Sequence, residues 1–388
     1  MRLNSRTLQV IDSPITTTYE LVRHRQDDRE LLNLAQAVPP YAPAPEVIAH
    51  VEEIARSGLA GAGYTEVPGL PKVREAFAAE LSRDYAGTVE PGNVLVTAGC
   101  NQAFCLLAST LCDPGDELIV PVPYYFNHEM WLRLDGIRPV YLEPGPDLVP
   151  RVEDAAALIT PRTRAILLVT PGNPHGLTLS PETIASFAAL ARERGIALIL
   201  DETYRSFRDT GAPAHDLFAD PDWGDVLVSL HSFSKDLAIP GYRVGAIVAS
   251  PQVHRECAKL MDCIAVCAPR IGQEAVWAGL TQAAAWRANR SAEVRRNRQA
   301  FVEAMTERPG GFELLSSGAY FGWVKHPFDA PTMDVARDLV AHQSLLLVPG
   351  TAFTPDDRGT LRFSVTNLPP ESLQELISRL REAGERAR

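Results

Sequence analysis

The sequence predicts an α/β protein with a large αβα domain, built on a mostly parallel sheet, and a smaller α/β domain at its C-terminal end. From residue 94 to about residue 250, short β-rich runs alternate with helical segments, which is typical of parallel strands joined by crossover helices. After residue 250 the pattern changes to helices, expected at 252–262, 270–288 and 292–307. With 388 residues the chain is long enough for two domains.

Composition and charge narrow the class of protein. The chain is 46% hydrophobic and 22% charged, as in a globular protein with a large core. Its net charge of −11 argues against nucleic acid or an anionic membrane as a partner. No apolar run approaches the roughly 18 residues that span a bilayer, and the N-terminal segment lacks the apolar core of a signal peptide. The six cysteines have neither CxxC nor zinc spacing, so we expect reduced thiols, no bound metal and a cytoplasmic enzyme.

The first third of the chain is expected to contain a loop and two helices. Residues 33–45 are too rich in proline for a helix or a central strand, so they predict an extended loop. Helical periodicity follows at 45–57 and stops at a glycine. The turn at 63–71, which contains Tyr64, leads into a second helix expected at 72–85.

The first strand of the alternating region is expected at 94–97, and it ends in a turn built on Gly99. Cys100 and Asn101 follow this glycine, and a helix then continues to about Cys112. A glycine turn at a helix N-terminus offers free backbone N–H groups to a phosphate. The ordinary alternative is a strand-to-helix turn without a ligand.

Aromatic and amide side chains end the next two strands. The strand that begins near residue 117 runs into Tyr124 and Tyr125, and an aromatic residue at this position either stacks on a ring or fills the core. The following strand, AILLV, stops at a Pro-Gly-Asn-Pro turn, in which Pro174 keeps Asn173 out of helical geometry.

A well-marked helix precedes the fourth strand. Ser180 is expected to cap this helix, proline occupies its first position, and Gly195 ends it. The buried strand 196–200 follows and places Asp201 and Tyr204 at its end. A carboxylate there either caps a helix or pairs with a cation such as a protonated ring nitrogen.

The stretch VLVSLHSFSKDLAIPGYRVG, from residue 226 to 245, contains the most distinctive motif. Its apolar first five residues predict a buried parallel strand. Ser232, Ser234 and Lys235 follow the strand, and Arg243 stands between two glycines. Hydroxyls and a guanidinium at a strand end suit a phosphate. A lysine beside them suits a Schiff base with an aldehyde cofactor.

The C-terminal part is expected to contain a strand-turn-strand at 312–325 and an alternating strand at 361–365. Arg362 on this last strand is either exposed or placed to bind a carboxylate. An amphipathic helix with proline at its start ends the chain.

Five motifs follow the apolar strands, at the carboxyl ends where open α/β sheets bind ligands. We therefore expect them to form one site. The five motifs lie at 97–103, 123–125, 173–176, 201–204 and 232–235.

In this order the motifs resemble those of the fold-type I pyridoxal-5′-phosphate (PLP)-dependent enzymes, in the class I/II aminotransferase branch. The lysine signature is S-x-S-K followed by G-x-R-x-G. The family's other motifs are matched by T-x-G-x-x-Q-A, N-P-x-G, D-x-x-Y and V-P-G-x-x-F. The resemblance extends from about Asn33 to Ala383 and implies an aspartate-aminotransferase-like, fold-type I architecture.

The resemblance implies a role for each site residue. Lys235 would hold PLP as an internal aldimine and act as general base, while Asp201 pairs with the ring nitrogen and Tyr204 with the phenolic oxygen. Arg362 and Asn173 would bind the substrate carboxylate. The implied catalytic residues are Lys235, Asp201 and Tyr204, and the implied substrate-binding residues are Ala37, Asn173 and Arg362. The implied cofactor-binding residues are Gly99, Cys100, Asn101, Tyr125 (with Tyr124 as alternative), Asn173, Asp201, Tyr204, Ser232, Ser234, Lys235 and Arg243. The resemblance also implies a homodimer in which Tyr64 of the partner subunit binds the cofactor.

The resemblance also implies a division of the chain into three parts. Residues 1–44 form an N-terminal arm and a substrate-side loop that packs with the small domain, 45–285 form the large PLP-binding domain, and 286–388 form the small domain. Ala37 departs from the family, which has a glycine there, and its methyl group would narrow the pocket or mark a different backbone path. His175 replaces a threonine, and its turn favours a solvated histidine over a titratable group at the cavity edge.

The implied reaction moves an amino group between an L-amino acid and a 2-keto acid. Another PLP reaction on an amino acid, catalysed by a β- or γ-eliminating lyase, a cyclase or a decarboxylase, remains the alternative because these enzymes share the same anchoring residues. An inactive, ligand-binding relative is disfavoured by the intact motifs. A Rossmann dehydrogenase is disfavoured because the first strand-turn-helix lacks G-x-G-x-x-G.

Overall fold

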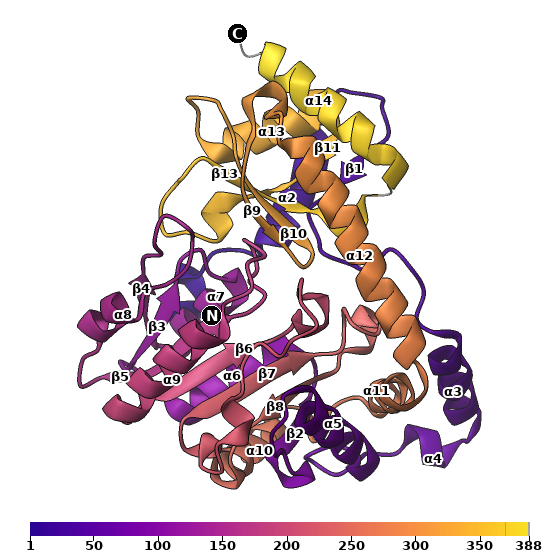
Figure 1. Ribbon diagram of the computed structural model, residues 1–388, viewed down its shortest axis with the longest axis vertical. Coiled ribbons are helices and arrows are strands. Elements are labelled where there is room, and N and C mark those ends of the chain that lie inside the picture. The colour runs from indigo at the N-terminus through magenta and orange to yellow at the C-terminus, as the bar shows by residue number, and fades with distance from the viewer. Residues whose placement is uncertain (369, 387–388) are drawn as a thin grey trace.

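A seven-stranded sheet forms the centre of the larger domain, in the computed structural model that describes residues 1–368 and 370–386 (Figure 1). The strand order is β2-β8-β7-β6-β5-β3-β4, and every neighbouring pair is parallel except the two that involve β8. Apart from the edge strand β4, its strands are short runs that are largely buried, as expected for a sheet covered on both faces. The strands are β2 (Val94–Thr97), β3 (Glu117–Pro121), β4 (Arg138–Leu142), β5 (Thr163–Val169), β6 (Ala197–Asp201), β7 (Leu227–Ser232) and β8 (Gly245–Val248).

Helices cover both faces of this sheet, with α8 and α9 on the opposite side from α6 (Figure 1). The predicted caps of α9 are confirmed: the Ser180 hydroxyl accepts a hydrogen bond from the Thr183 amide at 3.1 Å, and Gly195 ends the helix at φ 64°. The helices of this domain are α3 (Pro45–Arg56), α4 (Leu59–Ala62), α5 (Pro71–Asp84), α6 (Cys100–Leu111), α7 (Phe126–Asp135), α8 (Val152–Leu158), α9 (Pro181–Arg194), α10 (Pro251–Ala265) and α11 (Arg270–Gln282).

The smaller domain has an antiparallel four-stranded sheet with its own hydrophobic core. The strand order is β12-β13-β10-β9, and the expected strand-turn-strand is the pair β9 and β10. Its elements are β9 (Glu313–Gly318), β10 (Phe321–Lys325), α13 (Thr332–Gln343), β11 (Leu345–Leu346), β12 (Val348–Pro349), β13 (Thr360–Ser364) and α14 (Leu373–Arg386).

The N-terminal segment reaches the smaller domain before the chain enters the larger one. Two short helices, α1 (Ser5–Gln9) and α2 (Pro14–Glu20), precede β1 (Leu32–Asn33), which pairs in parallel with β11. Residues 34–44 form no helix or strand, in agreement with the predicted extended loop. Within this loop, the carbonyl of Ala35 contacts Arg362 of the smaller domain and the carbonyl of Ala37 contacts Lys235 of the larger one.

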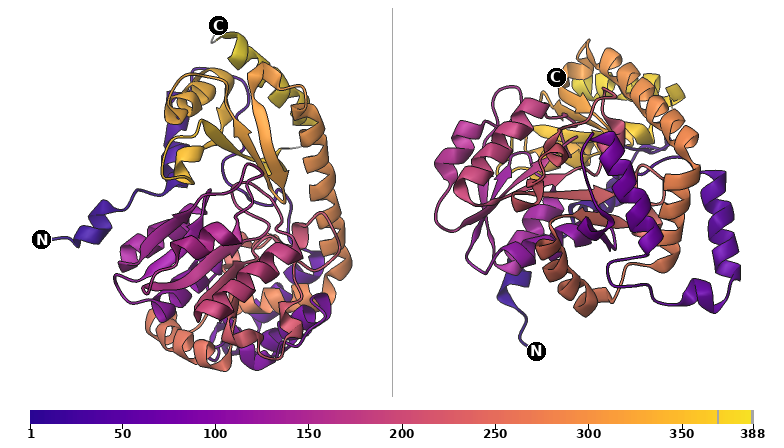
Figure 2. Two further views of the ribbon diagram at one scale, coloured as in Figure 1. Left: turned by 60° about the vertical axis from the view of Figure 1, so that its left-hand side comes forward. Right: turned by 60° about the horizontal axis from the view of Figure 1, so that its bottom comes forward.

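A single long helix, α12 (Ala284–Met305), connects the two domains along one side of the molecule (Figure 2). Trp286 near its start packs against the core of the larger domain, and Phe301 belongs to the core of the smaller one. The predicted break between the helices at 270–288 and 292–307 is wrong. The first helix, α11, already ends at Gln282, and α12 runs through the expected break. Residues 284–305 contain neither glycine nor proline, so nothing local interrupts the helix.

In the described part of the chain, no helix combines the length and the apolar character that crossing a membrane requires.

Candidate active site

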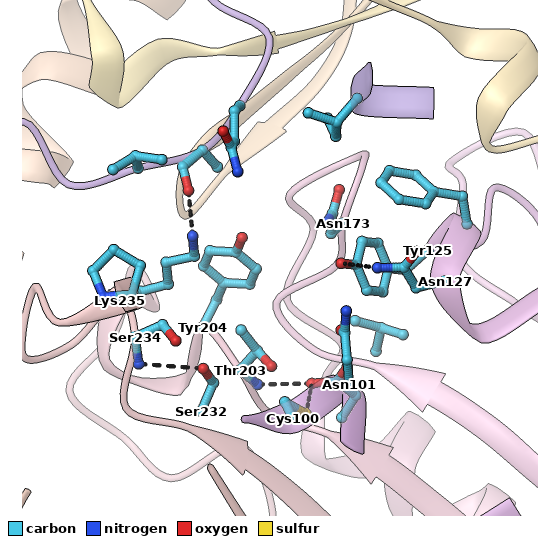
Figure 3. A pocket seen from close by; sticks show the side chains of 18 of the residues that line it. Cys100, Asn101, Tyr125, Asn127, Asn173, Thr203, Tyr204, Ser232, Ser234 and Lys235 are labelled. Carbon is cyan, nitrogen blue, oxygen red and sulfur yellow. Dashed lines mark hydrogen bonds between the residues drawn. The ribbon is translucent and has the colours of Figure 1, made fainter. Parts of the chain in front are cut away.

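Except for Gly99 and Tyr64, the predicted site residues converge on one cavity of about 490 Å³ at the carboxyl ends of the large sheet (Figure 3). Its floor comes from the residues that follow β2, β5, β6 and β7, and Arg362 on β13 closes it from the smaller domain. The lining residues are Ser13, Ile15, Gln36, Ala37, Val38, Cys100, Asn101, Tyr125, Phe126, Asn127, Val169, Asn173, Asp201, Thr203, Tyr204, Ser232, Ser234, Lys235, Pro240, Arg243 and Arg362.

Lys235 extends from the end of β7 across the cavity toward the 34–44 loop (Figure 3). Its Nζ donates a hydrogen bond to the backbone carbonyl of Ala37. Burial lowers the pKa of Lys235 to about 8, and the positive charges of Arg362 and Arg243 act in the same direction. A substantial fraction of this amine is therefore neutral and nucleophilic near pH 8, where an ordinary lysine is almost fully protonated.

Asp201 lies at the end of β6, buried at the base of the cavity. Its Oδ1 accepts a hydrogen bond from the Thr203 amide at 2.9 Å, and its Oδ2 lies 3.2 Å from Nε2 of His128. Burial alone would raise the pKa of Asp201, but the hydrogen bonds from His128 and Thr203 outweigh it and hold the pKa below its usual value. Asp201 is therefore a fixed negative charge.

His128 supports Asp201 but was not identified from the sequence. It lies on α7, three residues after Tyr125, and its ring contacts those of Phe104 at 4.2 Å and Tyr125 at 5.1 Å between centroids. A single histidine in a helix has no distinctive spacing. Only the packing of α7 against α6 brings it to the end of β6.

A cationic and hydrogen-bonding end of the cavity is formed where β2 and β7 stop. Gly99 is the N-cap of α6 with φ 89°, and a Cβ placed on it would come within 2.3 Å of Nη2 of Arg243. Cys100 and Asn101 at the helix start line the cavity together with Ser232 and Ser234, whereas Gly99 does not. A helix N-terminus, two hydroxyls and a guanidinium suit a phosphate group.

Arg362 is buried between two aromatic rings rather than exposed on its strand. Its guanidinium lies 5.0 Å from the ring centroid of Phe321 and 4.9 Å from that of Phe353. Nη1 donates to Oδ1 of Asn173 at 2.9 Å, and Nη2 donates to the backbone carbonyl of Ala35. The two domains thus meet through Arg362 and Asn173, and the fork of the guanidinium is held rigidly at the cavity wall.

The tyrosines of the site occupy distinct positions. Tyr125 lines the cavity, and its hydroxyl accepts a hydrogen bond from Nδ2 of Asn127 at 2.9 Å. Tyr124 instead stacks on Tyr141 outside the cavity, with centroids 5.5 Å apart. Tyr204 lines the cavity and packs against Tyr320, 5.4 Å away.

Tyr64 and His175 lie away from this cavity. Tyr64 is 79% exposed and does not line it. The expected solvated turn at His175 is wrong, because the imidazole is half-buried under the Asn173 turn and its Nδ1 accepts a hydrogen bond from the Leu177 amide at 3.1 Å. Burial lowers the pKa of His175 to about 4, so the ring is neutral at physiological pH.

The chemical groups that line the cavity match those of PLP. The helix start and Arg243 match its phosphate, the ionised Asp201 matches a protonated pyridine nitrogen, and Lys235 matches its aldehyde. Tyr125 and Tyr204 supply an aromatic face and a phenol beside these groups.

Comparison with known proteins supports this fit. Residues 29–380 match the family model for class I and II aminotransferases. The aromatic aminotransferase ISS1 of Arabidopsis thaliana is 30% identical over 90% of this chain and 89% of its own length. The aspartate/prephenate aminotransferase of Thermus thermophilus is 28% identical, with 98% of each chain covered. Among solved structures, an aspartate aminotransferase from Thermus thermophilus with maleate matches with a TM-score of 0.88 at 27% identity, over 99% of this chain and 100% of that one.

The match spans both domains, every strand-end motif and the small-domain arginine, and the expected fold-type I architecture is confirmed. The chain belongs to the class I and II aminotransferase family, whose members use PLP as cofactor.

Proposed function

We propose that this aminotransferase transfers the amino group of an α-amino acid to a 2-keto acid, with Lys235 as the catalytic base and Arg362 as the carboxylate-binding residue. The observation that carries the proposal is that Lys235, Asp201 and Arg362 all line one cavity, although they come from separate strands and from both domains. Their chemistries are the three that amino-group transfer requires: a base, a fixed negative charge and an anchor for a carboxylate.

Arg362 would orient the substrate. A guanidinium presents a planar fork of N–H donors that binds both oxygens of a carboxylate. The rings of Phe321 and Phe353 on either side restrict the rotation of this fork. With the α-carboxylate held there, the rest of the amino acid would lie in the cavity that Lys235 also lines.

Lys235 would move the proton. When bound, PLP supplies an aldehyde that takes up the amino group and an aromatic ring that delocalises the electrons left on Cα. The Nζ of Lys235, which burial keeps partly neutral, would remove the proton from the substrate Cα and hold it within the cavity. Asp201, oriented by His128 and Thr203, keeps its negative charge throughout.

The half-reaction tests this function. We expect a single reactive amino acid, without a keto acid, to convert the enzyme to its amine form and to yield about one keto acid per site before the reaction stops. Absorption spectra and mass spectrometry of the product measure both events, and addition of an acceptor keto acid should restore the original spectrum. Continuous turnover of one amino acid without an acceptor would instead identify a lyase, cyclase or decarboxylase.

A homodimer with Tyr64 acting across the interface extends the proposal. The Thr65 amide lies 3.5 Å from the sulfur of Cys267, which places Tyr64 beside the turn after α10. Exposed apolar side chains gather there: Tyr64 is 79% exposed, Ile264 60% and Val266 38%. Such a group supports burial against a second copy of the chain, which would bring Tyr64 to the phosphate end of the partner's cavity.

Mixed dimers test this arrangement. A Tyr64→Phe subunit paired with a Lys235→Ala subunit carries both lesions in one site and leaves the other site intact. We therefore expect the isolated mixed dimer to regain about half of the wild-type activity, and to contain one site with wild-type cofactor affinity. Activity no higher than that of the Tyr64→Phe homodimer, or full activity in a stable monomer, would contradict the role of Tyr64.

The division at residues 1–44, 45–285 and 286–388 belongs to the same proposal. The two hydrophobic cores and the position of α12 support it, as does the pairing of β1 with β11. A cytoplasmic location is proposed from the composition alone.

A further inference from the structure

We propose that the amino-acid substrate has an uncharged, largely apolar side chain, which Ile15, Val38 and Phe126 recognise. This inference rests on the proposed function and specifies its substrate class. The named relatives differ in this respect, because their names include aromatic, arginine–pyruvate and aspartate aminotransferases. The selectivity must therefore be inferred from the cavity of this chain.

The charged side chains of the cavity already have partners within the proposed reaction. Among the described lining residues these are Asp201, Lys235, Arg243 and Arg362. Asp201 would hold the ring nitrogen, Lys235 the aldehyde, Arg243 the phosphate and Arg362 the α-carboxylate. Within this subunit, a substrate side chain with its own charge would have to share one of these four groups or lose its hydration without a counter-ion, and both options are unfavourable.

Phe126 lies on the same side of the cavity as the carboxylate-binding arginine. Its ring centroid is 5.5 Å from that of Phe353, and the guanidinium of Arg362 lies over the same Phe353 ring at 4.9 Å. Phe126 also contacts Tyr125, with centroids 4.8 Å apart. An amino acid whose carboxylate is bound by Arg362 would therefore have its side chain close to an aromatic wall.

Val38 belongs to the loop that spans the two functional groups. The carbonyl of Ala35 accepts a hydrogen bond from Arg362, and that of Ala37 accepts one from Lys235. The backbone between these two carbonyls therefore connects the proposed carboxylate-binding group with the proposed base. Val38 follows directly and adds a branched apolar side chain to the cavity lining.

Ile15 supplies the third apolar side chain from α2 of the N-terminal segment. It is half-buried, lines the cavity and packs against the same hydrophobic cluster that contains Phe126. Its neighbour Thr16 is exposed and does not line the cavity. The N-terminal segment thus closes the side-chain end of the site with an alkyl group.

Selectivity can be measured with the PLP-loaded enzyme and four amino acids: L-leucine, L-phenylalanine, L-aspartate and L-arginine. We expect kcat/KM for the better of the first two to exceed that for aspartate and arginine by at least about 100-fold, because charged side chains would be desolvated without a partner. Aspartate or arginine reacting within tenfold of the best uncharged substrate overturns this inference and leaves the proposed function intact. Failure of every amino acid to yield a keto acid overturns both.

A matched pair of variants tests whether Ile15 contributes to this substrate selectivity. Ile15→Lys places a cation inside the cavity, whereas Thr16→Lys adds the same charge one residue away on the exposed face. We expect Ile15→Lys to raise the ratio of kcat/KM for aspartate over leucine by at least about tenfold and Thr16→Lys to leave it unchanged. Equal ratios in wild type and both variants, with normal cofactor spectra, would show that Ile15 does not contact the substrate side chain.

Discussion

Replacing Lys235 with alanine is expected to reduce kcat by at least about 10³-fold, because the variant lacks the only base proposed to take the α-proton. The cofactor should still bind through Arg243 and the start of α6, but it would no longer be attached covalently, so borohydride treatment would fix no pyridoxyl group at position 235. Steady-state transamination and the absorption spectrum of the loaded protein measure the two effects.

The control for this variant is Lys259→Ala. Lys259 lies on the exposed side of α10 in an ion pair with Glu256, so its removal changes the charge of the chain equally but leaves the cavity untouched. We expect wild-type activity from it. A Lys235→Ala enzyme that retains more than a tenth of wild-type kcat would remove Lys235 from its proposed role.

Asp201→Asn is expected to lower kcat by about 10²–10³-fold while the cofactor stays bound, since a fixed charge opposite the ring nitrogen is lost. An asparagine amide is similar in size but neutral, and it cannot keep the nitrogen protonated. Transamination rates and a titration of bound cofactor separate the two effects.

Asp220→Asn provides the matched control, because Asp220 pairs with Arg192 at 2.6 Å on the surface and carries the same charge. If Asp201→Asn kept activity within a few-fold of wild type, Asp201 would only stabilise the turn through its bond with the Thr203 amide.

The strand-end motifs made most of the cavity predictable, because parallel strands place their carboxyl ends at one edge of the sheet. Asp201, Asn173 and Lys235 are each read from a short segment in which an apolar run stops at a polar residue. The expected alternation of strands and helices is confirmed over this region. Such signals are local, so a single sequence contains them.

Tertiary packing explains what the sequence did not predict. β8 is a short apolar run that inserts antiparallel between β2 and β7, and nothing in its residues distinguishes it from the end of the preceding loop. His128 reaches Asp201 only through the placement of α7. His175 is half-buried where the two domains meet, and the Ser316 hydroxyl on β9 of the other domain donates to its backbone carbonyl at 2.8 Å.

The three apolar residues proposed to contact the substrate side chain could not be predicted from the sequence either. Ile15, Val38 and Phe126 lie in three segments whose spacing in the chain carries no common pattern. They meet because the N-terminal segment pairs with the smaller domain before it crosses to the larger one. Arg362 illustrates the same limit, since its alternating strand is compatible with exposure, and its burial depends on tertiary contacts with Phe321, Phe353 and Asn173.

The central claim, that Lys235 anchors the cofactor at the meeting point of these motifs, is tested most directly by borohydride reduction followed by peptide mapping. The chain has four lysines, Lys72, Lys235, Lys259 and Lys325, which fall in separate segments and are easily distinguished by mass. Reduction of the PLP-loaded protein should fix one pyridoxyl group per chain on the peptide that contains Lys235. An adduct on any of the other three lysines, or a protein that carries no adduct after loading and reduction, would contradict the account.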